Sequence, residues 1–129
     1  MTKRFYVSSR KDRGAQADAL ADVLKARGWE RTFKWTDQSN GGPDAHAALA
    51  VEELEGVRKA DVVIVLLPGG YGTHVEIGAA LALGKPVIIH APDQNILDTP
   101  YPCIFHYHPR IKLVISENLD INVVLACMP

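Results

Sequence analysis

A glycine-rich segment that ends in a carboxylate is the part of this sequence best suited to chemistry: Pro68-Gly69-Gly70-Tyr71-Gly72-Thr73-His74-Val75-Glu76. Glycines between a strand and a helix let a ligand approach the backbone, and the free N–H groups at a helix start favour an anion such as phosphate. The GxGxxG and P-loop patterns are excluded, because Val75 occupies the third glycine position and no Gly-Lys-Ser/Thr follows. The segment predicts a phosphate or ribose loop of another kind, with these binding residues: Gly69, Gly70, Gly72 and Thr73.

Glu76 has two interpretations. In the first, Thr73-His74-Val75-Glu76 is a capping box, in which Thr73 caps a helix and Glu76 reaches back to the Thr73 N–H. In the second, a carboxylate held rigidly beside the glycine loop attacks the anomeric carbon of a sugar. The spacing alone favours the capping box. The position in the ligand crevice and the small, apolar helix that follows favour the nucleophile.

Short apolar runs alternate with helical patterns, and these elements must position the loop and Glu76. Strands are predicted at residues 5–7, 31–35, 62–67, 86–90, 103–107 and 111–115. Helices are predicted at residues 15–27, 43–58, 73–83 and 117–126. The alternation predicts an α/β fold: a three-layer Rossmann- or flavodoxin-like open parallel sheet of about five strands with helices on both faces, in one domain over residues 1–129. Ligands of such sheets lie beyond the carboxyl ends of the strands, which nominates residues 8–10, 68–73 and 90–92.

Composition narrows the classes of partner. The formal net charge is −1 and the opposite charges are interspersed, so we expect no nucleic-acid polymer as ligand. The longest apolar run, residues 62–67, is far shorter than the roughly 20 residues that span a bilayer, and the N-terminus lacks a signal-peptide pattern. Cys103 and Cys127 make neither a disulfide framework nor a metal-binding spacing. These features predict a cytoplasmic protein that does not bind membranes.

The middle third of the chain resembles the nucleoside 2-deoxyribosyltransferase family, which includes nucleoside 5′-monophosphate N-glycosidases. The resemblance lies in three runs and, more loosely, in a fourth: Ala60-Asp61-Val62-Val63-Ile64-Val65, Glu76-Ile77-Gly78-Ala79-Ala80, Gly84-Lys85-Pro86-Val87 and Phe5-Tyr6-Val7-Ser8-Ser9. Pro-Gly-Gly-x-Gly-Thr-x-x-Glu also resembles the cytokinin-activating phosphoribohydrolases. Both resemblances imply cleavage of the N-glycosidic bond of a nucleoside or nucleoside 5′-monophosphate, with hydrolysis or transfer to another base and without a cofactor.

The resemblance also implies roles for two carboxylates. Glu76 stands at the position of the family's nucleophile, which forms a glycosyl-enzyme. Glu53 stands where the family usually has an aspartate, eight residues before Asp61. On a helical wheel Glu53 and His46 lie on one flank of an apolar stripe made of Ala47, Ala50, Val51, Leu54 and Val57. The alternative is a solvated Glu53 that pairs with neighbouring basic residues.

Further candidates follow the first two strands. Ser8, Ser9 and Arg10 could hold phosphate or sugar hydroxyls, and the alternative for Arg10 is a solvated loop. The Tyr6 hydroxyl needs a partner if it is buried, and it could orient the nucleophile. Trp35 could form an aromatic wall for the base or be a half-buried loop residue.

The histidines give weaker signals. His74 could hydrogen-bond the base or sugar, or face solvent. His90, His106 and His108 lack a metal-binding pattern such as HExxH, so no metal site is predicted. The resemblance implies a homo-oligomer, a dimer or larger, in which C-terminal residues complete a neighbour's pocket. The cluster Phe105-His106-Tyr107-His108 is the candidate for that role.

Two other functions stay open at the level of sequence. One is a non-catalytic nucleotide-binding or sensing module that uses the same crevice, since folds of this kind host both uses. The other is an N-glycosidase that cleaves the nicotinamide bond of NAD. Binding of nucleotides without turnover would favour the first alternative, and release of nicotinamide would identify the second.

Overall fold

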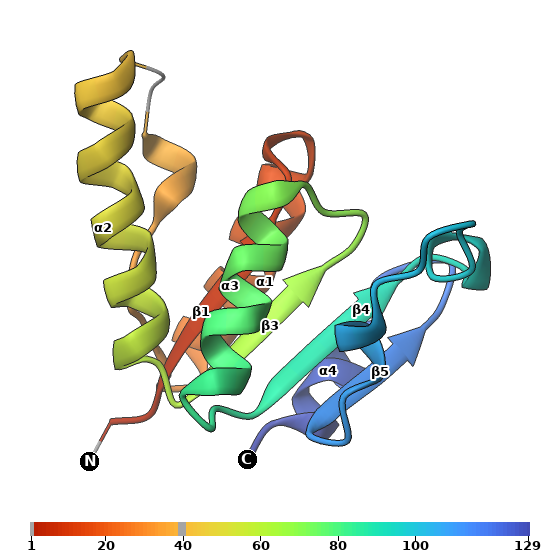
Figure 1. Ribbon diagram of the computed structural model, residues 1–129. Coiled ribbons are helices and arrows are strands. Elements are labelled where there is room, and N and C mark those ends of the chain that lie inside the picture. The colour runs from red at the N-terminus through yellow and green to blue at the C-terminus, as the bar shows by residue number, and fades with distance from the viewer. Residues whose placement is uncertain (1, 39–40) are drawn as a thin grey trace.

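A parallel, five-stranded open sheet forms the centre of the computed structural model, which describes residues 2–38 and 41–129 (Figure 1). Its strands are β1 (Arg4–Ser9), β2 (Glu30–Arg31), β3 (Val62–Leu66), β4 (Val87–Ala91) and β5 (Ile111–Ile115), in the order β2-β1-β3-β4-β5. This is the flavodoxin-like order, in which the chain reverses its direction of winding between β1 and β3. The carboxyl ends of these two strands are therefore the expected ligand crevice.

Helices cover both faces of the sheet. They are α1 (Gly14–Ala26), α2 (Pro43–Lys59), α3 (Tyr71–Ala82) and α4 (Ile121–Cys127). Figure 1 shows α2 and α3 on one face and α1 and α4 on the other. The predicted α/β class and the parallel open sheet with helices on both faces are confirmed. Among the described residues, no helix has the length and apolar character needed to cross a membrane.

The alternation of side chains along β1 decides what lies under α3. Successive strand residues point to opposite faces of a sheet, so Tyr6 and Ser8 share one face. Both side chains are fully buried, as are the five residues of β3 beside them. In the register of the sheet, Ser8 lies next to Val65 and Ser9 next to Leu66, near the carboxyl end of β3. Two hydroxyl groups are thereby placed under the helix that carries Glu76.

The edges of the sheet differ from the sequence prediction. The second strand is only Glu30–Arg31, and Trp35–Asp37 forms a 3-10 turn instead, because the Trp35 indole N–H donates to the Val7 carbonyl at 2.7 Å. The predicted strand at residues 103–107 is also a 3-10 turn, Ile104–Tyr107, in which the His106 N–H donates locally to the Cys103 carbonyl at 3.1 Å instead of to a neighbouring strand. The last helix begins late, where the Asp120 side chain accepts the Asn122 N–H at 2.9 Å.

Helix α2 packs on the sheet only near its end. Gly56 and Val57 are buried, whereas the rest of the predicted apolar stripe is exposed: Ala47, Ala50, Val51 and Leu54. A Cβ at Gly56 would lie 3.0 Å from the Tyr6 ring and from the Phe33 Cβ. The missing side chain therefore lets α2 approach Tyr6 closely, one turn away from Glu53.

Candidate active site

The Glu76 carboxylate is fixed from below by two hydroxyl groups of β1. The Tyr6 hydroxyl donates to Glu76 Oε2, and the Ser8 hydroxyl donates to Oε1 at 2.6 Å. Glu76 is only 5% exposed, so these buried bonds replace much of the hydration that its carboxylate loses. The predicted role of Tyr6 in orienting Glu76 agrees with this contact. The sequence reasoning did not foresee that Ser8 would hold the second oxygen.

The capping-box interpretation of Glu76 is wrong. Helix α3 begins at Tyr71 with Gly70 as its N-cap, and no side chain caps it. Thr73 is therefore inside the helix, three residues after the N-cap Gly70, and the Glu76 side chain bonds to β1. The glycine loop starts the helix early, which removes the geometry that a capping box needs.

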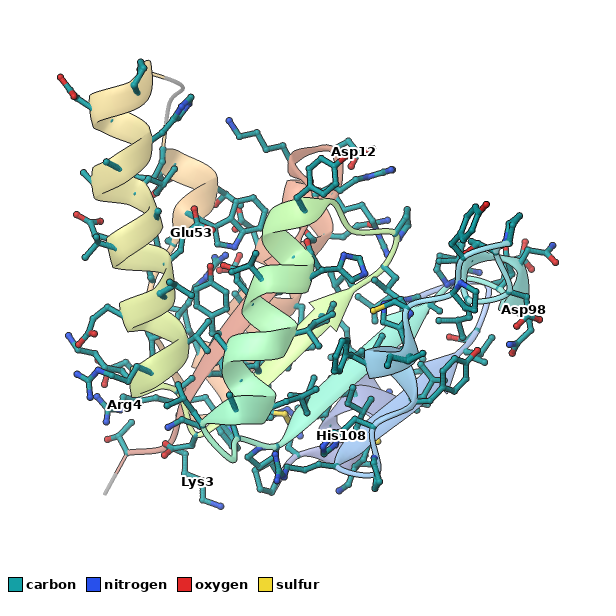
Figure 2. The ribbon with its side chains drawn as sticks, in the orientation of Figure 1. Lys3, Arg4, Asp12, Glu53, Asp98 and His108 are labelled. Carbon is teal, nitrogen blue, oxygen red and sulfur yellow. The ribbon has the colours of Figure 1, made fainter. Side chains whose placement is uncertain are left out.

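Glu53 approaches the same tyrosine from α2. Its Oε1 lies 3.3 Å from the Tyr6 hydroxyl, and the residue is half-buried. Figure 2 shows Glu53 on the side of α2 that faces α3. The ion pair expected of a solvated helix glutamate belongs to Glu55, which bonds to Arg58. The geometry thus supports Glu53 as part of the site.

One phenol therefore lies between two carboxylates. Tyr6 has a single hydroxyl proton, so it can donate to one carboxylate at a time. Burial raises the pKa of Tyr6, and the negative charges of Glu76 and Glu53 raise it further. The phenol therefore stays protonated and acts as a donor. Two carboxylates this close are most stable when a proton resides on one of them.

Burial is also the main cause of the shifted pKa of Glu76, which is raised to about 8. The hydrogen bonds from Ser8 and Tyr6 act in the opposite direction, because they stabilise the charged form. The neighbouring Glu53 raises the pKa again through like charge. A carboxyl group that titrates near neutral pH inside a cleft is typical of a catalytic site.

A pocket of about 300 Å³ opens above the two carboxylates. It lies at the carboxyl ends of β1 and β3, where the strand order predicts a ligand. Its walls are Ser9, Arg10, Lys11, Trp35, Glu53, Gly70, Gly72, Thr73 and Glu76. The sequence predicted all of these residues except Lys11, so chain segments far apart in sequence do meet here.

Two of the wall residues are already engaged. The Trp35 indole, 8% exposed, is held by its bond to the Val7 carbonyl, so it forms a rigid side of the pocket. The exposed Arg10 guanidinium bonds to both oxygens of Asp12, at 3.1 and 2.8 Å. A phosphate would have to compete with Asp12 for Arg10.

Four predicted substrate-binding residues do not line this pocket. Ser8 is fully buried beneath Glu76, where its hydroxyl holds the carboxylate instead of a substrate. His46 is exposed on the projecting half of α2 and does not line the pocket. Gly69 and His74 line a different pocket, on the other side of the glycine loop. Their roles in binding substrate remain predictions without a contact in the pocket that contains Glu76.

Two positioning residues were missed at the level of sequence. The Arg13 guanidinium donates to the carbonyl of Leu67, which precedes the cis-proline Pro68, and so joins the loop after β1 to the glycine loop. Gly56 permits the close packing of α2 on Tyr6. A glycine in the interior of a helix lowers the stability of that helix, so Gly56 within a predicted helix was a signal that another segment packs closely against it.

Two solved structures share this fold. The CMP N-glycosidase of Clostridium botulinum is 23% identical, with a TM-score of 0.68 over 98% of this chain and 100% of that chain. The 2-deoxyribosyltransferase of the psychrotolerant bacterium Bacillus psychrosaccharolyticus is 19% identical, with a TM-score of 0.62 over 94% of this chain and 89% of that chain. At these identities the likeness shows the fold.

Family membership rests on the sequence itself. No match was found among curated proteins. A family profile described as nucleoside 2-deoxyribosyltransferase matches residues 6–119. The matched region runs from Tyr6 through both carboxylates and past β5. The chain therefore belongs to the nucleoside 2-deoxyribosyltransferase family.

Proposed function

We propose that this enzyme cleaves the N-glycosidic bond of a nucleoside or nucleoside 5′-monophosphate, with Glu76 as nucleophile. One observation carries the proposal: a buried carboxylate is held by Tyr6 and Ser8 at the base of a pocket that Glu53 also lines. Family membership supports cleavage of the same bond. The two structural neighbours, named as a CMP N-glycosidase and a 2-deoxyribosyltransferase, support it as well.

In the first step, a Glu76 oxygen attacks C1′ of the sugar. The C1′–N bond breaks, and its electron pair leaves with the base. The Tyr6 and Ser8 hydroxyls hold the carboxylate in one orientation, which removes much of the entropic cost of attack. The departing base takes a proton from Glu53, the second carboxylate of the pocket.

In the second step, water or another base resolves the glycosyl-enzyme. When water attacks C1′, its proton returns to Glu53 and the bond between C1′ and Glu76 breaks. The Glu76 carboxylate is then restored, and both groups regain their initial protonation. When a second base attacks C1′ instead, its proton passes to Glu53, the bond between C1′ and Glu76 breaks, and the sugar is transferred to that base.

The glycine loop supplies the anion-binding part of the proposal. Gly70 and Gly72 line the pocket at the start of α3, whose first N–H groups have no acceptors within the helix. These groups and the helix dipole favour a 5′-phosphate or the ribose hydroxyls. A side chain at Gly69 would collide with Thr73, so the loop can lie close to the helix only with glycine there.

A substrate panel tests the function. The full chain is incubated with nucleosides, their 5′-monophosphates and NAD, and released base is separated by chromatography. We expect base release from at least one nucleoside or monophosphate, and at least about a thousandfold loss in Glu76→Ala. Nicotinamide release from NAD alone would identify a different N-glycosidase. Calorimetric binding of nucleotides without turnover would overturn the enzymatic proposal in favour of a sensing module.

We also propose that the chain forms a homo-oligomer through α2. The exposed apolar residues of its predicted stripe support this, since Val51 is 69% and Leu54 is 42% exposed. Light scattering after size-exclusion chromatography should give a dimer or larger species, and Val51→Glu should shift it toward the monomer. A monomeric wild type would contradict the proposal.

A further inference from the structure

Three metal-binding side chains meet on the far side of the glycine loop. They are His74, from the first turns of α3, and Cys103 and His106, at the start and within the 3-10 turn before β5. One ligand atom from each residue lies within 4.8 Å of the other two. The two Nε2 atoms of the histidines are only 2.9 Å apart. His106 is buried, and the other two residues are half-buried.

The orientation of His74 fits that of a metal ligand. Its Nδ1 lies 2.8 Å from the Gly70 carbonyl oxygen, which can only accept a hydrogen bond. Nδ1 therefore carries the proton, and Nε2 presents a lone pair toward His106. Metal-binding histidines commonly donate their second ring N–H to a backbone carbonyl in this way, which fixes the tautomer.

His106 has no other polar anchor among the described residues. Its Nδ1 is buried without a hydrogen-bond partner. Its ring lies against that of His74, with centroids 5.0 Å apart. The Nε2 side of the His106 ring therefore lies toward His74. Burial of the unpartnered Nδ1 is unfavourable, so this position of the ring calls for an explanation.

We propose that His74, Cys103 and His106 form a binding site for a divalent transition metal, with zinc as the best fit. Two imidazoles and a thiolate are a typical zinc donor set, whereas magnesium and calcium take oxygen ligands. Bonds of about 2.0 Å in a tetrahedral ion would need the nitrogens about 3.3 Å apart, so the pair must open by only a few tenths of an ångström. The fourth position is left for water or a small ligand from the adjoining pocket of about 250 Å³.

The ion would join two segments that are remote in sequence. His74 is bonded to Gly70, which lines the pocket above Glu76, while Gly69 lines the pocket beside the cluster. A bound metal would therefore hold the glycine loop against the turn Ile104–Tyr107. It would act on the loop from outside the carboxylate site and would take no part in the attack on C1′.

The sequence predicted no metal site, because His90, His106 and His108 lack a metal-binding pattern. Of these three histidines, only His106 lies in the cluster. His90 is in β4, where its Nε2 lies 3.0 Å from the Ser116 carbonyl, and His108 accepts the Arg110 backbone N–H. His74 takes their place, from a segment far from the other two ligands in sequence.

Metal titration of the full chain tests the site without reference to activity. After removal of metals by a chelator, wild type is titrated with Zn²⁺ and separately with Co²⁺. We expect one ion per chain and, with cobalt, a thiolate charge-transfer band together with the strong visible bands of four-coordinate Co²⁺. Cys103→Ser should abolish the thiolate band and weaken zinc binding at least about tenfold. His74→Ala should weaken binding to a similar degree.

Two matched variants serve as controls. Cys127→Ser removes the other free cysteine, and His108→Ala removes a histidine next to the same turn, so both should bind zinc as wild type does. Because His106 is buried, the conservative Cys103→Ser carries the test, with circular dichroism as the check on folding. Failure of wild type to bind zinc, or binding that survives in both Cys103→Ser and His74→Ala, would overturn the proposal.

Discussion

The Tyr6 hydroxyl on β1 donates a hydrogen bond to the Glu76 carboxylate on α3, across the interface between sheet and helix. The same hydroxyl lies 3.3 Å from Glu53 on α2. One phenol therefore couples the protonation of two carboxylates that come from different helices. The proposed chemistry depends on this coupling, because the nucleophile must be ionised while its partner holds a proton.

Tyr6→Phe should weaken catalysis more than binding. The variant removes a hydrogen bond to the charged form of Glu76, a loss of roughly 1.5 to 3 kcal/mol, so we expect kcat to fall about 10- to 100-fold with little change in KM. That bond also lowers the pKa of Glu76, so its loss should move the midpoint of the pH profile of activity to higher pH. Ser8→Ala removes the other such bond and should shift the profile in the same direction. An unchanged pH profile in both variants would contradict the assignment.

The pH dependence of kcat/KM should report the proton that Glu76 and Glu53 share. The pKa of Glu76 in the free protein is raised to about 8, whereas the reaction needs Glu76 ionised and a proton on Glu53. We therefore expect kcat/KM to fall as pH rises through about 8, where the pair loses this proton. Glu53→Gln has no acid to lose and lacks the like charge that raises the pKa of Glu76, so its residual activity should instead rise with pH, with a midpoint below about 8. Initial rates between about pH 5 and pH 10 check both statements.

The same shift predicts an effect on stability. The folded-state pKa of Glu76 lies above its unfolded value, so between pH 4.5 and about 8 the folded state binds more protons than the unfolded state. This group therefore lowers the free energy of unfolding as pH rises through that window. Glu76→Gln removes the ionisation, so it should be more stable than wild type at pH 9, by roughly 2 to 4 kcal/mol.

Thermal or urea unfolding at two pH values measures this difference. Near pH 3 the wild-type carboxyl is protonated in both states, so the two proteins should unfold alike. The amide of Gln can still accept from Tyr6 and donate to the Ser8 oxygen, which keeps the packing comparable. Equal stability at pH 9 would show that burial does not raise the pKa as described.

Much of the fold could be predicted from sequence because it depends on local patterns. The buried runs of β3 and β4 and the alternation with helices identify a parallel sheet, and the sheet rule then places residues 8–10 beside the glycine loop. The role of the Glu76 side chain was harder to predict, because the segment Thr73-His74-Val75-Glu76 fits both a capping box and a nucleophile beside a glycine loop. The observed start of α3 and the hydroxyls of β1 exclude the capping box, and the nucleophile stays a proposal.

The errors have a common physical cause, which is contact between remote segments. The helical wheel identifies the apolar stripe of α2 but not which part the sheet covers, so the exposure of Val51 and Leu54 could not be foreseen. The approach of His74 to Cys103 and His106 depends on how α3 and the turn before β5 pack together. No periodicity in the sequence encodes such a pairing.

Gly56→Ala should reduce activity from outside the pocket. The added Cβ would lie 3.0 Å from the Tyr6 ring and from Phe33, so α2 or Tyr6 must move. Such overpacking costs about 1 to 3 kcal/mol and would displace Glu53 from the phenol. We therefore expect a lower melting temperature and a lower kcat. Gly78→Ala is the matched control, because a Cβ there meets nothing within 4 Å and should stabilise α3 by about 0.5 to 1 kcal/mol. If the two variants had the same activity, the close approach at Gly56 would not be what positions Glu53.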